Sequence, residues 1–235
     1  MDDSGAYEVV MLLVAAAAAP VMVVWERHLS RGRRARIASW AAQRGWNFVA
    51  RDPRWEHVLP GFPFGTGFRW RARNVVSGPF GRYPAAAFEY SYQGERRNDG
   101  MIPQRFGVHV LRLPAPLPWL HLSAERFADR AAKLFGAQDL DFESEDFNRL
   151  YRVRAIDPRL ASDIVNPRTM ELLIEVGGPD VRIHGWNIAL VTPGRLDLEV
   201  VEGALTVLAN VCDNVPPFVW RDHGGAAPLA PGARS

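Results

Sequence analysis

The sequence predicts an α+β protein, with a single N-terminal transmembrane helix followed by an antiparallel β-meander and helices packed on it. Three observations predict this class. Residues 9–25 form an uncharged apolar run, short segments of alternating polarity follow, and helical spacing with capping residues dominates the second half. The 235 residues, 48% hydrophobic and 23% charged, suffice for one domain of ordinary size with tails.

The apolar run VVMLLVAAAAAPVMVVW is at the short end of the roughly 17–25 residues that cross a bilayer. Acidic residues precede it, where a cleaved signal peptide has basic ones. A basic flank follows, which the positive-inside rule assigns to the cytoplasm. We therefore expect a single-pass cell-membrane protein with its C-terminal domain in the cytoplasm; a buried helix of a soluble protein is the alternative. The flank is also expected to contact anionic lipid of the inner leaflet, through Arg27, Arg31, Arg33, Arg34 and Arg36.

Four segments follow from this pattern. Residues 1–28 are the predicted transmembrane anchor, and residues 29–45 a basic juxtamembrane helix that ends at Gly45. Residues 46–220 are the predicted soluble α+β domain. Residues 221–235 are rich in Pro, Gly and Ala and are expected to form a disordered tail.

The first half of the domain is predicted to be strands, because apolar and polar residues alternate between turn signals. The expected strands are 46–50, 68–77, 85–92, 106–113 and 119–122, with a Pro- and Gly-rich loop at 52–67 and a hairpin connection at 93–100. In strand 68–77, Arg69, Arg71 and Arg73 alternate with apolar residues. Their face is predicted to be solvated, and a binding face for an anionic partner is the alternative.

The second half is predicted to be mostly helical. Ser123 is a candidate N-cap for a helix at 124–135, Asp157 for 158–164, and Asn166 with Pro167 for 168–176. Further expectations are an extended segment at 140–143, a helix at 145–150, a strand at 151–155, a hairpin of 181–184 with 188–192, and a long apolar helix at 196–212.

No catalytic motif stands out. The sequence lacks a phosphate-binding loop, a nucleophile elbow and a paired-histidine zinc motif, and its six histidines are dispersed. The single Cys212 excludes an internal disulfide framework. The acidic run at 139–146 lacks the Gly and Glu that a calcium loop needs. We therefore predict no catalytic residue, no metal and no cofactor, and a net charge of only +2 argues against a nucleic-acid partner.

One block resembles a known bacterial family. The stretch DLDFESEDFNRLYRV, followed by AIDPRLASDIVNPRTMELLIEV and VRIHGWNIALV, is similar to the core of the family called domain of unknown function 3137. The matching residues are Phe142, Glu143, Ser144, Phe147, Asn148, Tyr151, Val153, Asp157, Ala161, Pro167, Met170 and Leu173. The resemblance implies anchoring by N-terminal helices, and it implies no particular reaction.

Within that block, Phe142, Phe147, Tyr151 and Val153 are core candidates, whereas Glu143 and Asn148 have no evident packing role. These two polar residues are the candidates for function. The sequence thus favours a membrane-tethered cytoplasmic binding or scaffold module with an unknown protein partner over an enzyme. The alternative is a membrane-anchored, hydrolase-like enzyme that uses Glu143.

Overall fold

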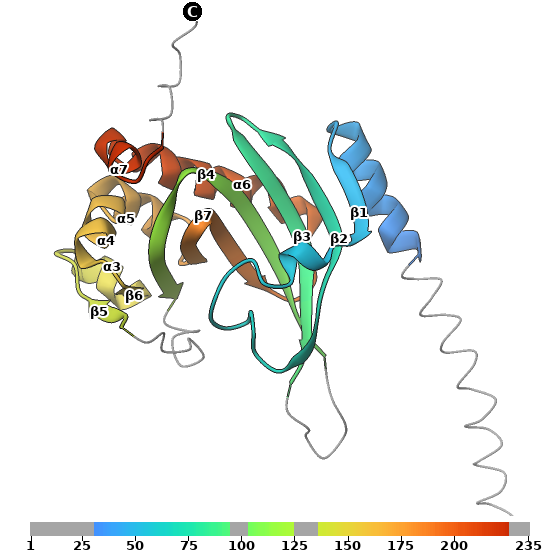
Figure 1. Cartoon of the computed structure of the whole chain (residues 1–235), viewed down its shortest axis with the longest axis horizontal. Helices are drawn as coiled ribbons and strands as arrows, with labels where there is room; N and C mark the ends of the chain where they lie inside the picture. Colours follow the sequence, from blue (N-terminus) through green and yellow to red (C-terminus); the bar gives the residue numbers. More distant parts are fainter. Residues whose placement is uncertain (1–30, 95–102, 125–135, 226–235) are drawn as a thin grey trace, which may run out of the picture.

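The computed structural model describes residues 31–94, 103–124 and 136–225, so the predicted anchor at 1–28 lies outside the described part (Figure 1). In the described ranges no helix is both long and apolar enough to span a membrane. The helix 31–43 is followed by seven strands, β1 Asn47–Arg51, β2 Phe68–Phe80, β3 Tyr83–Gln93, β4 Pro103–Ala124, β5 Gln138–Leu140, β6 Tyr151–Ala155 and β7 Asp180–Pro193. The helices among and after them are η1 Pro53–Trp55, α3 Glu145–Leu150, α4 Pro158–Ile164, α5 Pro167–Glu175, α6 Leu198–Asn214 and α7 Pro217–Asp222.

The fold is α+β, with an antiparallel sheet and helices packed against it, as the sequence predicts. The strand order is β1-β2-β3-β4-β6-β5, and β7 pairs with β4. The first part of β4 lies between β3 and β7, and its last part lies between β6 and β7. The long strand β4 therefore connects two halves of one sheet.

The prediction of separate strands at 106–113 and 119–122 is wrong, because both belong to the 22-residue β4. Prolines at 114, 116 and 118 suggested an interruption. They lie in the segment where β4 has left β3, whose pairing ends at Leu111, and has not yet met β6, whose pairing begins at Leu120. A missing N–H costs little where a strand lacks a neighbour on one side.

The predicted hairpin of 181–184 with 188–192 is also wrong, since the two segments form the single strand β7. Gly185, which suggested a turn, has φ +55° and pairs with Leu117 at the bend of β4. The register shifts between Arg112 and Leu120 accommodate the same bend. The two longest strands thus bend together, and glycine supplies the left-handed backbone that this requires.

One face of the sheet, which we call the inner face, carries the larger core. The helix 31–43 contributes Ile37 and Ala41, and α6 contributes Val201, Leu205 and Leu208. The helices α3, α4 and α5 cover the same face over the second half of the sheet (Figure 1). The first helix therefore packs on the sheet and is part of the folded unit.

Local capping explains where the helices of the second half begin. Ser144, Asp157 and Asn166 each accept a hydrogen bond from the backbone N–H three residues later, as expected of N-caps. The expected cap at Ser123 is wrong, because this residue is in β4 and its hydroxyl donates to the carbonyl of Arg152. The helix that it was expected to start, 124–135, falls almost entirely outside the described residues. The short α7 was not expected.

The opposite, outer face of the sheet carries a smaller core, which the loop 52–67 covers. Leu59 and Phe64 from the loop pack on Phe88, Tyr90 and other residues of β3, β4 and β7. The ring centroids of Phe64 and Tyr90 lie 4.7 Å apart. The loop thus covers part of this face and leaves the β2–β3 hairpin end to form the site described next.

Candidate functional site

A groove with a cavity volume of about 520 Å³ lies on the outer face of the sheet, beyond the end of the loop 52–67. Strand register determines its floor. Ser77 of β2 lies opposite Ala86 of β3, which lies opposite Val110 of β4. Pro79 and Pro84 are opposite each other two residues closer to the hairpin, and therefore on the same face. The floor is a patch of small side chains drawn from three strands.

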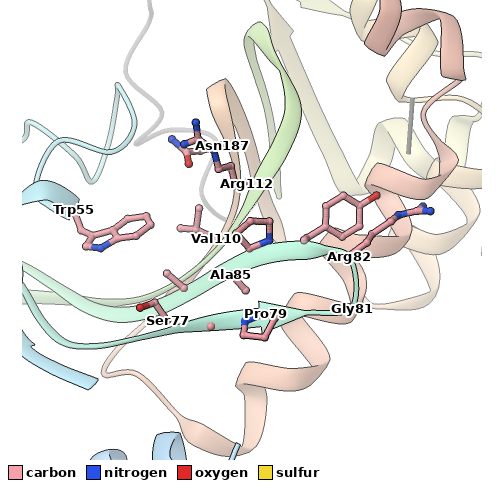
Figure 2. Close-up of a pocket in the computed structure, with 13 residues that line it drawn as sticks. Trp55, Ser77, Pro79, Gly81, Arg82, Ala85, Val110, Arg112 and Asn187 are labelled. Carbon is pink, nitrogen blue, oxygen red and sulfur yellow. The ribbon is translucent and has the colours of Figure 1, made fainter. Parts of the chain in front are cut away.

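Small side chains explain why this part of the sheet is hollow. Further along the same strands, the outer face carries Phe88, Tyr90 and Phe106, which the loop covers. Here the corresponding positions hold Ser, Ala, Pro and Val, so no bulky side chain fills the space. Trp55, from the one-turn helix η1, closes one end, where its ring centroid is 5.3 Å from that of Phe88 (Figure 2).

The rim of the groove is polar and basic. Arg112 of β4 lies opposite Asn187 of β7, and both line the groove on the same side (Figure 2). The Arg112 guanidinium is 5.0 Å from the ring centroid of Trp186, a side chain that is 42% exposed. At the hairpin end, Arg82 is paired with Asp213 of α6. Of these rim arginines, Arg112 forms no ion pair with a described residue.

The chemistry of the lining favours binding. The residues around the groove include Arg82, Tyr83 and Arg112 as ionisable groups, and no Asp, Glu, His or Cys. Tyr83 donates to Asp213 over 2.6 Å, and burial raises the pKa of its hydroxyl. The lining therefore lacks the acid–base pair that hydrolysis requires. It can offer an apolar floor, an aromatic wall and a basic rim.

A second constellation, a buried polar row, lies on the outer face of the second half of the sheet. Arg154 of β6, His121 of β4 and Arg182 of β7 are direct neighbours across the strands. His121 Nε2 is 3.0 Å from Asp180, and Arg182 donates two hydrogen bonds to the same carboxylate. Burial opposes ionisation of Asp180, but Arg182 and His121 lower its pKa to about 2. The sequence analysis did not connect these residues.

This buried row has a structural role. The nearest cavity, lined by Asp180 and Arg182, measures about 10 Å³, which is at most the volume of one water. Ser123 lies two residues after His121 on the same face of β4, and its hydroxyl donates to the carbonyl of Arg152. Burial lowers the pKa of His121, so the ring is neutral at pH 7. The row satisfies buried charges and has no room for a substrate.

The two functional candidates from the family-like block occupy different environments. Asn148 bridges a turn, because its amide donates to the carbonyl of Phe142 over 2.6 Å and accepts from the N–H of the same residue over 3.0 Å. Glu143 is exposed, and no hydrogen bond or ion pair joins it to another described residue. In the described part of the chain, no group of three or more His, Cys, Asp or Glu side chains could hold a metal ion.

The predicted arginine contacts lie mostly on the helix 31–43. Arg27 is outside the described residues, Arg31, Arg34 and Arg36 are exposed, and Arg33 is half-buried. On β2, Arg71 and Arg73 lie on one face, since they pair with Ser91 and Glu89 of β3. Arg69 departs from the expected alternation, because it has φ +55° and lies at a register shift.

The groove was not predictable from the sequence, because its residues come from four strands and the loop. A weak signal was present: Ser77, Pro79, Pro84 and Ala86 are small residues at alternate positions flanking one hairpin. Small residues at such positions leave one face of a hairpin without bulky side chains. The pairing of these strands, and the place where the loop ends, are needed to turn that signal into a groove.

A scan against protein-family models finds no match, and a search of curated proteins finds none either. The fold is similar to that of a transport factor. A crystal structure of the mycobacterial trehalose monomycolate transport factor A, TtfA, superposes with a TM-score of 0.59. The aligned part covers 78% of this chain and 94% of that chain, at 13% sequence identity. At this identity the similarity establishes a shared fold.

Proposed function

We propose that this protein is a membrane-tethered accessory module of a transport assembly, and that the groove on the outer face binds a segment of a partner protein on the cytoplasmic side. The groove carries this proposal. It is open, its floor is apolar, and its lining offers no acid–base pair. Such a surface suits binding better than catalysis.

The fold similarity supports the same class of role. The protein with the similar fold is named a transport factor, and the aligned region is nearly its whole length. The resemblance of residues 139–190 to domain of unknown function 3137 adds the expectation of N-terminal anchoring. The proposed anchor at 1–28 and the basic flank place the domain in the cytoplasm under the positive-inside rule.

The rim indicates what kind of segment fits. Arg112 makes one side of the groove basic, whereas Arg82, at the hairpin end, is already paired with Asp213. Trp55 and the proline floor offer apolar contact. A partner segment with an apolar residue flanked by a carboxylate would match both surfaces. The exposed Trp186 beside Arg112 extends this surface beyond the groove.

Photocrosslinking in native membranes tests the proposal. A photoreactive amino acid replaces Pro84, which is exposed in the groove, and a matched control replaces Ser162, which is exposed on α4. We expect a discrete crosslinked partner from position 84 and none from position 162. Adding Arg112→Gln or Trp55→Ala should weaken that crosslink.

The same adduct from both positions, or no adduct at position 84, would contradict groove binding. The hydrolase alternative is not supported by a specific observation, because the exposed Glu143 lies apart from the groove lining. A partner whose crosslink survives Arg112→Gln and Trp55→Ala together would also refute the proposed contact surface.

A further inference from the structure

A second surface on the inner face of the sheet carries more positive than negative side chains. The strand register forms two rows across β2, β3 and β4. Arg73 lies opposite Glu89, and Arg71 lies opposite Ser91, which in turn lies opposite Arg105. All these side chains share a face, because they occupy alternate positions of paired strands.

The helix 31–43 adds to this surface. Arg33 lies 3.5 Å from the Glu89 carboxylate and also donates to the carbonyl of Leu196. Arg105 lies 4.0 Å from the same carboxylate. Burial and the neighbouring Arg71, Arg34 and Arg105 lower the pKa of Arg73, whereas Glu89 raises it. The five arginines at 33, 34, 71, 73 and 105, which we call the basic face, outnumber the carboxylates beside them. These are Glu89, which pairs with Arg33 and Arg105, and Asp197 and Glu199, which line a cavity together with Arg33.

This surplus of positive charge calls for an external anion. Glu89 is 8% exposed and pairs with Arg33 and Arg105, so it offsets only part of the charge. Like charges packed on one surface repel each other and raise the free energy of the folded state. An anionic partner that contacts all five arginines would relieve this repulsion. The five arginines are spread over a helix and three strands. An extended anionic partner therefore fits this surface better than a small anion does.

Chain connectivity brings the basic face close to the proposed membrane segment. The apolar run ends at residue 25, and Arg33 follows eight residues later. Eight residues span at most about 30 Å when fully extended. If the run crosses the bilayer, the first arginines of the basic face are held within that distance of the leaflet surface. Two of the five, Arg33 and Arg34, continue the basic flank itself.

We propose that the basic face docks the folded domain against the anionic inner leaflet, so that Arg71, Arg73 and Arg105 contact lipid headgroups together with Arg33 and Arg34. This inference rests on the proposed tether, and it adds a defined orientation of the domain. The groove lies on the other face of the sheet. It is also toward the opposite end of β3, about 23 Å from Ser91 at roughly 3.3 Å per residue from Pro84. Docking therefore leaves the groove turned away from the lipid and open to a partner.

The test uses the full-length chain reconstituted in nanodiscs, either neutral or with anionic phosphatidylglycerol, that carry a spin-labelled lipid headgroup. Cys212 is buried and is the one cysteine of the sequence, so a new surface thiol can be labelled alone. A fluorophore on Ser91→Cys reports on the basic face, and one on Ser162→Cys reports on the exposed surface of α4. We expect strong quenching at position 91 in anionic discs, weak quenching there in neutral discs, and little quenching at position 162.

Neutralising the basic face should abolish the difference in quenching at position 91 between anionic and neutral discs. Each arginine near an anionic leaflet contributes on the order of fivefold to the docking equilibrium, so Arg71→Gln with Arg73→Gln and Arg105→Gln should lower it on the order of a hundredfold. The matched control, Arg149→Gln with Arg152→Gln and Arg159→Gln, removes the same charge from exposed positions elsewhere and should keep the quenching. High salt should act like the first triple variant, because screening weakens exposed charges. This salt titration of the unmodified arginines also decides the matter if the triple variant fails to fold.

The outcomes separate this inference from the tether. If the protein enters neutral and anionic discs alike but position 91 is quenched equally in both, the tether stands and the docked orientation is wrong. If the protein fails to enter neutral discs, the tether is wrong, whereas quenching at position 91 by anionic discs alone would still support the basic face. Stronger quenching at position 162 than at position 91 would overturn the inference.

Discussion

His109 shows, at the scale of a single residue, how an ionisable group can shape stability without serving a site. It is fully buried in β4, between Ala87 and Leu190 on the neighbouring strands, and neither ring nitrogen has a hydrogen-bond partner. Burial lowers its pKa from about 6.5 to about 4, although the Asp197 carboxylate acts in the opposite direction. The folded protein therefore holds the neutral ring.

The sign of the pH dependence follows from this shift. Between pH 6.5 and 4 the unfolded chain binds a proton at His109 that the folded chain does not bind, so acid favours unfolding. A shift to about 4 lowers the free energy of unfolding by about 3 kcal/mol at pH 4 relative to pH 7. His109→Leu should remove that part of the pH dependence, as measured by chemical denaturation across this range.

His184→Leu provides the control, because it removes a histidine from an exposed position of β7. Burial lowers the pKa of His121 as well, so the His109 variant should keep a smaller residual slope over this range. Asp180, with a pKa of about 2, stays ionised in the folded protein down to pH 4. A constant difference between native protein and His109→Leu from pH 7 to 4 would show that the ring is not buried in its neutral form.

Phe147 carries the second prediction at this scale. The sequence identified it as a core residue, and it is 0% exposed, with its ring centroid 4.9 Å from that of Tyr151 and 5.7 Å from that of Phe142. Phe147→Ala should lower the free energy of unfolding by roughly 3–5 kcal/mol, through lost burial and the cavity left behind. The same change at Phe68, which is 44% exposed, should cost far less in the same denaturation experiment. Similar losses at both positions would mean that Phe147 is not a core anchor.

At the scale of elements, the ends of the helices were predictable from local capping residues. The extent of the long strands was not predictable from local residues. The ends of α3 and α4 match the expected residues because Ser144 and Asp157 are side-chain caps. The strands β4 and β7 were each predicted as two strands. Residues that usually mark turns, Pro114, Pro116, Pro118 and Gly185, lie between the predicted pieces. A proline ends a strand only where a neighbouring strand needs its N–H. Which edge of the strand has such a neighbour is decided by segments far away in the sequence.

Two glycines, Gly78 in β2 and Gly203 in α6, test side-chain packing and helix propensity separately. A Cβ on Gly78 of β2 would be 2.4 Å from Cδ1 of Trp46, whose indole N–H donates to the carbonyl of Pro79. Gly78→Ala should therefore lower the free energy of unfolding by roughly 1–3 kcal/mol, because the indole must move. A Cβ on the exposed Gly203, inside α6, would meet nothing within 4 Å.

Gly203→Ala should consequently raise the free energy of unfolding by about 0.5–1 kcal/mol, since alanine favours helix. Thermal melting of both variants against the native protein checks this opposite pair of shifts. Should Gly78→Ala be neutral, the packing of Trp46 on β2 would be wrong. A destabilised Gly203→Ala would instead indicate that this surface of α6 is covered by something.

At the scale of the whole molecule, the near-neutral net charge conceals a strong asymmetry. The formal charge is +2, yet the five arginines of the basic face outnumber the carboxylates beside them, which are Glu89, Asp197 and Glu199. The sequence identified Arg33 and Arg34 through their place after the apolar run, and it noted Arg71 and Arg73 through alternation. Only the pairing of β2, β3 and β4 joins these two groups and adds Arg105. Fold class and helix caps are local or compositional properties, whereas both candidate surfaces depend on strand register.

The orientation of the chain is the last prediction, and it concerns the molecule as a whole. The apolar run at 9–25 is followed by a basic flank and preceded by Asp2, Asp3 and Glu8, so the positive-inside rule places everything after residue 25 in the cytoplasm. A reporter that is active only in the cytoplasm, fused after Ser235, should be active, and one that is active only outside the membrane should be silent.

The charge difference across the run is the physical cause, and it can be varied independently of the fold. Asp2→Lys with Asp3→Lys, combined with Arg27→Gln and Arg31→Gln, reduces the bias from five flanking arginines against no basic residue to three against two, and it leaves the core side chains unchanged. Some of the reporter activity should then move to the outside. An outside-active reporter on the native chain would reverse the assignment, and the groove and the basic face would have to meet partners on the other side of the membrane.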